Sequence, residues 1–218
     1  MPHALCHIVD VDPSNHHDVE VVARLHLQLL DWGPMAQLGG CFLERFCYTT
    51  LIQDGLMKAA YFEVDGQPAG FIAFTDHSIT FHRAAIKNHY GYVAYLVLIS
   101  ILRDPRVMLR LWRAMRLMFS RRSEKILGED PLAEIVAIGV LPEYRNPVFM
   151  RRTGLRISEE LVDHAASYFR SVGLKKIRLV IDADNHAALM FYRSLGAQVE
   201  LYEQAGNPAV HVWLDLVR

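Results

Sequence analysis

The stretch Glu134–Arg156, EIVAIGVLPEYRNPVFMRRTGLR, determines how the rest of the chain is interpreted. Its first part is rich in β-branched residues up to Val140, which predicts a strand, and Pro142 prevents the hydrogen-bonded ladder from continuing. A basic loop follows, whose charges are Arg145, Arg151 and Arg152. Beyond the loop, apolar residues recur at helical spacing and predict a helix over 154–172; they are Ile157, Leu161, Val162, Ala165 and Phe169.

The order of strand, basic loop and helix indicates an anion site. The first amides of a helix have no partner inside the helix, and the helix dipole adds partial positive charge at the same end. A phosphate or pyrophosphate is therefore expected over residues 151–158.

A second segment, NHAALMFYRSLGA at 185–197, follows a predicted strand at 177–181. Here the chain resembles the GNAT acyltransferase superfamily, whose late helix has the pattern Asn-x-x-Ala-x-x-x-Tyr-x-x-x-Gly-Phe. The matching positions are Asn185, Ala188, Tyr192 and Gly196, while Ala197 replaces the usual Phe. Ala133–Arg145 is similar to the fourth strand of that family and its exit. The resemblance extends over about residues 133–197 and is looser over 1–76.

The resemblance implies an α/β (α+β) fold with a mixed, mostly antiparallel central sheet flanked by helices. The whole chain, 1–218, would be one domain, with a helical insertion at 77–128 between the third and fourth strands. It also implies an N-acyltransferase that moves an acetyl or other acyl group from coenzyme A to a primary amine of a small molecule, such as an amino sugar or amino acid. Two alternatives remain open: a long-chain N-acyl synthase whose donor is acyl carrier protein, and a non-catalytic binding module.

The same resemblance gives roles to individual residues. Glu134 would act as the general base on the amine, and Tyr192 would act as the general acid on the departing thiolate. The splayed strand would offer amides to the acetyl-CoA, acyl-CoA or acyl-phosphopantetheine donor at Ile138, Gly139 and Val140. The remaining donor-binding residues would be Arg145, Arg151, Arg152, Thr153, Gly154, Leu155, Arg156 and Asn185, together with Tyr192.

The phosphate loop admits two alignments. The family places its pattern Gln/Arg-x-x-Gly-x-Gly/Ala directly after Tyr-Arg, whereas residues 146–150 intervene in this chain. One alignment uses Arg151–Arg156, and the other places Arg156–Ser158 where Gly-Ile-Gly is usual. In either alignment, the guanidinium of Arg156 could form a direct ion pair with the phosphates.

The insertion contains the most individual part of the sequence. Tyr92–Leu102 is apolar but shorter than the roughly 20 residues that cross a bilayer. A basic amphipathic helix is predicted next, with Arg106, Arg110, Arg113 and Arg116 at helical spacing. This helix is either a solvated face or a surface for an acyl carrier protein, an anionic membrane or a phosphorylated substrate. The apolar segment before it is expected to pack on the acceptor cleft or on a second subunit of a homodimer.

Composition excludes several classes of protein. The formal net charge of −1 predicts no general attraction to nucleic acid. The three cysteines and the scattered histidines show no metal-ligand spacing, so no metal site is expected. Unpaired thiols and the lack of a signal-peptide pattern favour the cytoplasm.

The N-terminal part predicts sheet and acceptor-side helices. A strand over 4–9 leads into a helix capped by Ser14 or Asn15, with His26 and Leu29 on its inward face. A second helix is expected over 37–51, and a hairpin over 58–64 and 67–75 turns at Asp65-Gly66. Four aromatic residues lie near the acceptor entrance expected from the resemblance, where core packing is their alternative role: Trp32, Phe42, Phe46 and Tyr48. A closing hairpin is predicted over 199–202 and 210–217.

Overall fold

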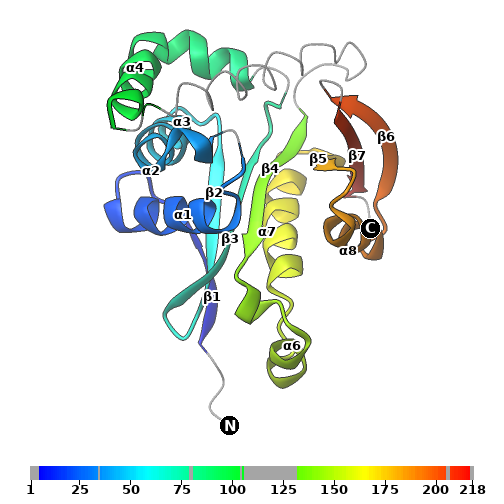
Figure 1. The fold of residues 1–218 in the computed structure, drawn as a ribbon. Coiled ribbons are helices and arrows are strands. Elements are labelled where there is room, and N and C mark those ends of the chain that lie inside the picture. Colours follow the sequence, from blue (N-terminus) through cyan, green and yellow to red (C-terminus); the bar gives the residue numbers. More distant parts are fainter. Residues whose placement is uncertain are drawn as a thin grey trace.

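A mixed β-sheet forms the centre of the molecule in a computed structural model that describes residues 5–33, 35–78, 81–103, 105, 132–204 and 207–216 (Figure 1). Within these residues the sheet has seven strands in the order β1-β2-β3-β4-β5-β7-β6. The strands are β1 (Cys6–Asp10), β2 (Lys58–Val64), β3 (Gln67–Thr75), β4 (Ala133–Val140), β5 (Lys176–Asp182), β6 (Gln198–Gln204) and β7 (Asn207–Asp215). All neighbouring pairs are antiparallel except β4 and β5, which confirms the predicted mixed and mostly antiparallel sheet.

Helices cover both faces of the sheet (Figure 1). One face carries α1 (His16–Leu29), the short helices from η1 to α3, and α4 (Phe81–Arg103). The short helices are η1 (Ala36–Leu38), α2 (Gly40–Phe42), η2 (Leu43–Thr50) and α3 (Leu51–Gln53). The other face carries α7 (Ile157–Ser171) and α8 (His186–Ser194). Alternate residues of β3 enter the two cores, Phe71 on the α1 side and Ile72 on the α7 side, as the period of a strand requires.

The β2–β3 hairpin has the predicted bounds and turns at Asp65-Gly66. Their φ angles are 51° and 74°, which is the left-handed backbone that a tight primed turn needs. The first helix likewise begins as expected, because the side chain of Asn15 accepts a hydrogen bond from the amide of His17. Local signals were sufficient in both places.

Strands β4 and β5 diverge like the arms of a fork. They pair only at Ala133 with Ile177 and at Glu134 with Arg178. Beyond that point the β5-facing edge of β4 has no strand partner among the described residues. A β-bulge lies at the same point, because Phe74 and Ala73 of β3 pair with Ile135 and Ala137, leaving Val136 between them without a partner on β3.

The segment after β4 corrects one prediction. The chain forms a short 3-10 turn, η4 (Pro142–Tyr144), and then a helix, α6 (Pro147–Thr153), where a basic loop was expected. The side chain of Asn146 caps α6 by accepting a hydrogen bond from the amide of Phe149, and Gly154 ends the helix with a φ of 74°. Helix α7 then begins at Ile157, three residues later than the sequence suggested.

The described part of the insertion is α4, whose backbone is non-helical at His89. It contains the predicted apolar segment and packs on the α1-side core through Ala85 and Leu96. The predicted basic helix from Arg106 to Arg116 lies outside the described residues. Among the described helices, none has the length and hydropathy needed to span a bilayer.

Candidate active site

A cleft of about 1070 Å³ occupies the opening of the β4–β5 fork. It is lined by β4 from Ile135 to Val140 and by β5 from Leu179 to Asp182. Its lining also includes α7 and α8 residues on one side, and residues of α1, η2 and the α1–η1 connection on the other. The separation of the strands therefore joins two chambers, which lie on opposite faces of the sheet, into one passage.

Tyr192 is the most distinctive polar residue of the α7–α8 side. Its side chain lines the cleft and is only 3% exposed. Its hydroxyl has no hydrogen-bond partner among the described residues, which is unusual for a buried phenol. Burial raises the pKa of Tyr192 above its ordinary range, so the hydroxyl carries its proton at neutral pH. It can therefore donate a hydrogen bond to a group that enters the cleft.

Asn185 places Tyr192 by starting α8. Its side-chain oxygen accepts a hydrogen bond of 3.1 Å from the amide of Ala188, so the predicted cap is confirmed. Asn185 and Ala188 also line the cleft. The motif thus fixes the start of the helix and presents its inner face to the cavity.

The N-terminus of α7 enters the same cleft without a side-chain cap. Its first-turn residues Ile157, Ser158 and Glu159 all line the cavity. Arg156 precedes them and forms an ion pair of 2.8 Å with Glu159. The exposed Arg145, which comes before α6 in the chain, also lines the cleft. The helix start at Ile157 favours the alignment that places Arg156–Ser158 at the phosphate position.

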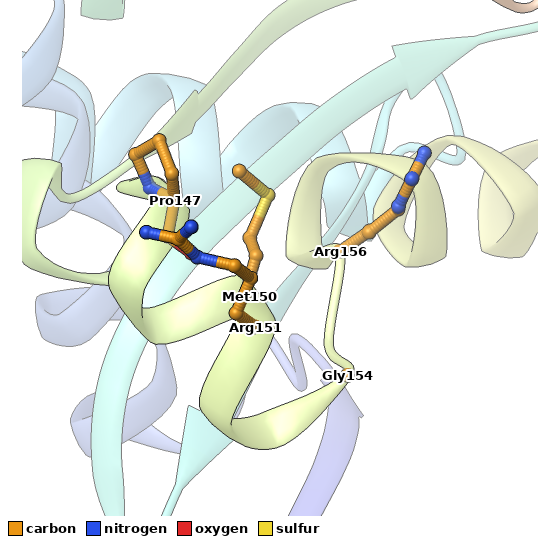
Figure 2. Close-up of a pocket in the computed structure, with 5 residues that line it drawn as sticks. All are labelled: Pro147, Met150, Arg151, Gly154 and Arg156. Atoms are coloured by element: carbon orange, nitrogen blue, oxygen red, sulfur yellow. The ribbon is translucent and has the colours of Figure 1, made fainter.

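Figure 2 shows a smaller hollow of about 390 Å³ outside the α6–α7 connection. Arg151 bends back along α6, and its Nε donates a 3.3 Å hydrogen bond to the carbonyl of Pro147. Arg156 lies on the other side of Met150 and points along α7. The hollow is lined by Pro147, Met150, Arg151, Gly154 and Arg156.

The predicted donor-binding residues therefore divide into three groups. Most line the large cleft: Ile138, Gly139, Val140, Arg145, Arg156, Asn185 and Tyr192. Arg151 and Gly154 line only the smaller hollow. Arg152, Thr153 and Leu155 line neither cavity. The formation of α6 explains the division, because it turns residues 151–153 into the end of a separate helix.

Glu134 lies at the closed end of the fork rather than in the cleft. Its carboxylate is buried, forms a 2.5 Å ion pair with Nη2 of Arg178 and accepts a hydrogen bond from Ser78. It is not among the residues that line the cavity. This location does not favour its predicted role as a base, which stays an untested prediction, and gives it a structural role at the junction of β4 and β5.

The α1 side of the cleft contains a buried polar pair that the family motifs do not identify. Nδ1 of His26 lies 2.6 Å from the hydroxyl of Tyr48, and the imidazole stacks on Phe71 with 5.3 Å between ring centroids. Both His26 and Tyr48 line the cleft. Helical periodicity had placed His26 inward, and Tyr48 was one of the four aromatic residues expected near the acceptor entrance.

The other three aromatic residues of that group differ in whether they line the cleft. Phe42 and Phe46 are buried in the α1-side core, with 5.1 Å between their ring centroids, and do not line the cleft. Trp32 lines the cleft and remains 58% exposed. Only Trp32 and Tyr48 of the four are thus available to a molecule in the cavity.

Gly139 allows α1 to approach β4 beside this pair. A Cβ at this position would lie 2.9 Å from Cδ1 of Leu29 and 3.3 Å from the ring of Phe71. The missing side chain thus permits close packing of α1 at the point where the edge of β4 is free.

Comparison with known proteins supports the arrangement. The chain matches the acetyltransferase (GNAT) family over residues 41–197. No curated protein matches it at a significant level. Among solved structures, the PaiA N-acetyltransferase from Thermoplasma acidophilum in complex with coenzyme A aligns over 97% of this chain and 99% of its own, with a TM-score of 0.56 and 13% identity.

Two further structures show the same fold. A chimera of the spermidine N-acetyltransferase SpeG from Vibrio cholerae covers 99% of this chain and 96% of its own, with a TM-score of 0.53 and 15% identity. An acetyltransferase from Thermus thermophilus covers 99% of both chains, with a TM-score of 0.53 and 11% identity. Since the family match covers most of the chain, including the fork and the α8 motif, the protein belongs to the acetyltransferase (GNAT) family and is an acyltransferase.

Proposed function

We propose that the protein is an N-acyltransferase that moves an acetyl or another acyl group from coenzyme A to the primary amine of a small molecule. The observation that carries this proposal is the buried hydroxyl of Tyr192, which has no hydrogen-bond partner among the described residues and lies in the cleft where β4 diverges from β5. An amino sugar or amino acid was the acceptor suggested by the sequence, and the acceptor is considered in the next section.

The residues of the cleft fit an acyl-CoA donor. The uncapped N-terminus of α7 offers free amides to phosphate oxygens, and Arg145 and Arg156 add positive charge there. The free edge of β4 at Ile138–Val140 offers backbone groups to the pantetheine arm and the thioester oxygen. Acyl-CoA supplies an activated acyl carbonyl and a thiolate leaving group.

The side chains then have separate tasks. An amide of β4 donates a hydrogen bond to the thioester oxygen, where negative charge grows as the amine attacks. The Tyr192 hydroxyl gives its proton to the sulfur as the carbon–sulfur bond breaks, and the proton that the attacking nitrogen loses on becoming an amide restores the hydroxyl through solvent. Glu134 and Arg178 hold the two strands together at the closed end of the fork.

The function is tested by donor titration and turnover. Acetyl-CoA should raise the melting temperature, and more so than an acetyl-loaded acyl carrier protein, because the tighter ligand stabilises more at equal concentration. Thiol release in the presence of a panel of primary amines measures transfer. A larger stabilisation by the carrier protein would favour the long-chain synthase, and donor binding without transfer would favour the non-catalytic module.

Tyr192→Phe should lower kcat by about 10²–10⁴-fold while the Kd for acetyl-CoA changes little, because the hydroxyl acts mainly in the transition state. Tyr168→Phe is the matched control, since the Tyr168 hydroxyl donates to Asp76 and does not line the cleft. Normal turnover in the Tyr192 variant would mean that another group protonates the sulfur.

The three cysteines bear on the cellular location. Cys6, Cys41 and Cys47 are all free thiols. We propose that the protein acts in the cytoplasm, where unpaired thiols stay reduced.

A further inference from the structure

The charged residues that line the cleft are segregated. Four charged side chains are found among the described lining residues, and all lie between residues 145 and 182: Arg145, Arg156, Glu159 and Asp182. The residues between 26 and 73 that line the other side include no Asp, Glu, Lys or Arg. We call this side the acceptor chamber. Its apolar lining consists of Leu29, Leu30, Trp32, Met35, Leu51, Met57 and Ala73.

The titratable groups of the acceptor chamber are neutral as well. Burial lowers the pKa of His26 to about 4, so the imidazole is uncharged at neutral pH. Burial raises the pKa of the Cys47 thiol to about 12 and that of Tyr48 well above its usual value. The described lining of the chamber therefore offers an incoming molecule no formal charge.

The polar atoms of the chamber are also few. The Tyr48 hydroxyl already bonds to Nδ1 of His26, and the remaining polar side chain is that of Gln28 at the exposed rim. Trp32 presents an exposed aromatic ring to the same space. The chamber thus offers a bound molecule aromatic and aliphatic contact surface. It offers few hydrogen-bond partners for several hydroxyl or ammonium groups.

We propose that the acceptor chamber takes a primary amine carried on an aromatic or hydrocarbon body and discriminates against polyamines, amino sugars and free amino acids. This inference rests on the proposed function, because it assigns the acceptor of the same reaction. A polyamine would bring ammonium groups into a chamber whose described lining has no carboxylate, and an unpaired buried charge is strongly unfavourable. Sugar hydroxyls and an amino acid carboxylate would lose water without gaining equivalent partners.

An apolar body suits the reaction for a second reason. The attacking amine must be neutral, and a site of low polarity favours the neutral form over the ammonium. The amine then reaches the thioester along β4, where Gly139 adjoins both Leu29 of the chamber and the free strand edge. The low polarity of the chamber thus favours both an acceptor with an apolar body and the neutral form of its amine.

The test compares 2-phenylethylamine, spermidine and glucosamine as acceptors with acetyl-CoA. The kcat/KM for 2-phenylethylamine should exceed the other two by at least about tenfold, since burial of an aromatic body is worth that much in an apolar site. Calorimetry of each amine with the enzyme–CoA complex measures binding independently of turnover, and the same order of affinity is expected.

Two variants and a control test whether the acceptor preference depends on the lining of the chamber. Trp32→Ala should lower kcat/KM for 2-phenylethylamine by about tenfold, whereas Tyr90→Ala removes an aromatic ring that is 73% exposed outside the cleft and should have no effect. Gln28→Glu adds one carboxylate at the rim with almost no change in shape, and should shift the preference toward spermidine by about tenfold.

Three results would overturn the inference. Preferred transfer to spermidine or glucosamine would refute the acceptor class while upholding acyl transfer itself. A preference for octanoyl-CoA that is lost in Trp32→Ala would show that the chamber holds the acyl chain instead. Failure of 2-phenylethylamine to bind the enzyme–CoA complex would also refute it, and failure of CoA itself to bind would remove the proposed function.

Discussion

At the scale of single residues, His26 shows how surroundings decide chemistry. The imidazole lies between Phe71 and Tyr48, and its burial favours the neutral form strongly enough to bring its pKa to about 4. A histidine in water would exchange its proton near physiological pH. In this structure the residue acts instead as a neutral hydrogen-bonding group in an apolar chamber.

The lowered pKa makes stability depend on pH. Because the unfolded state binds a proton at higher pH than the folded state, the stabilisation is full above about pH 6.5 and is lost as pH falls toward 4. The loss from this residue should be roughly 3 kcal/mol. Urea unfolding between pH 4 and 7.5 measures it.

His26→Gln should flatten that pH dependence, because glutamine has no proton to bind. His16→Gln provides the control, since His16 is exposed at the start of α1. If both variants lose stability with pH as steeply as the wild type, the dependence comes from other groups.

The sequence identifies these residues to different degrees. The motif with Asn185 and Tyr192 is local, so spacing was enough to place both on one short helix at the cleft. The contact between His26 and Tyr48 joins positions 22 residues apart. That the Tyr192 hydroxyl has no partner among the described residues depends on the surrounding fold. Such properties follow from tertiary packing, which periodicity does not specify.

At the scale of elements, the main surprise is α6. Its signals were present, with Asn146 at the cap and Pro147 at the first helical position. The family resemblance favours a phosphate-binding loop at Arg151 and Arg152 over a helix. Both arginines lie in the last turn of α6, where positive charge is favoured by the helix dipole, and their role as phosphate ligands stays a prediction.

Gly154 joins α6 to α7, so its replacement tests whether this connection positions the donor site. Gly154→Val should weaken acetyl-CoA binding and cost about 1–2 kcal/mol of stability, because a β-branched residue is strained at a φ of 74°. Gly154→Asn should retain most affinity, since Asn tolerates the left-handed conformation. Calorimetric titration of both variants with acetyl-CoA measures the difference.

Unchanged affinity in the valine variant would remove the connection from the donor site. That outcome would agree with the position of Gly154 in the smaller hollow alone. It would leave the first turn of α7 and Arg145 as the phosphate-binding groups.

Helix η2 is an element that the sequence could not predict. It is a π-helix from Leu43 to Thr50, within a region expected to be one regular helix. Its threonines support the wider turn, because Thr49 and Thr50 donate hydrogen bonds to the carbonyls of Glu44 and Arg45, five residues earlier. Widened turns of this kind are frequent at functional sites, and this one carries Tyr48 into the acceptor chamber.

At the scale of the whole molecule, β4 and β5 join two parts of the sheet through very few backbone pairs. Glu134 and Arg178 are buried at that junction, and Ser78 binds both of them. The ion pair therefore sits where the sheet would otherwise separate. Both charges are removed from water, so either charge alone at this position would be strongly destabilising.

Removing one partner should destabilise the fold by about 3–5 kcal/mol, whereas replacing both by apolar residues should cost much less. The variants are Glu134→Gln, Arg178→Met and the double variant Glu134→Leu/Arg178→Met, measured by urea unfolding. Lys176→Met is the control on the same strand, since its exposed pair with Asp215 should contribute at most about 1 kcal/mol.

The same variants test the predicted base. If Glu134 acts only at the junction, kcat per folded molecule should survive in Glu134→Gln once stability is accounted for. A large loss of kcat at full stability would instead support proton abstraction by this carboxylate.

The hairpin turn, the Asn15 cap and the start of α8 could be predicted from the sequence because their signals are local, and the arrangement of the sheet followed from the family resemblance. The segregation of charge between the two sides of the cleft could not be predicted from the sequence. It arises because residues from α1 and η2 meet β4 from one face, while Arg145 and Arg156 reach the cavity from the connections before α6 and before α7. Only the three-dimensional path of the chain brings these sets to opposite ends of one cavity.

Val136, which has no partner on β3, shifts the alternation of side chains between the two faces of β4 by one residue. Counting every second residue from Ile135 would assign Gly139 to the same face, toward α7. In the structure Ile135 contacts the α7-side core, whereas Gly139 faces Leu29 and Phe71 on the α1 side. An alignment with any relative that lacks this extra residue therefore needs a one-residue gap inside the strand, and without it every position from Ala137 to Val140 would be compared with the wrong side of the sheet.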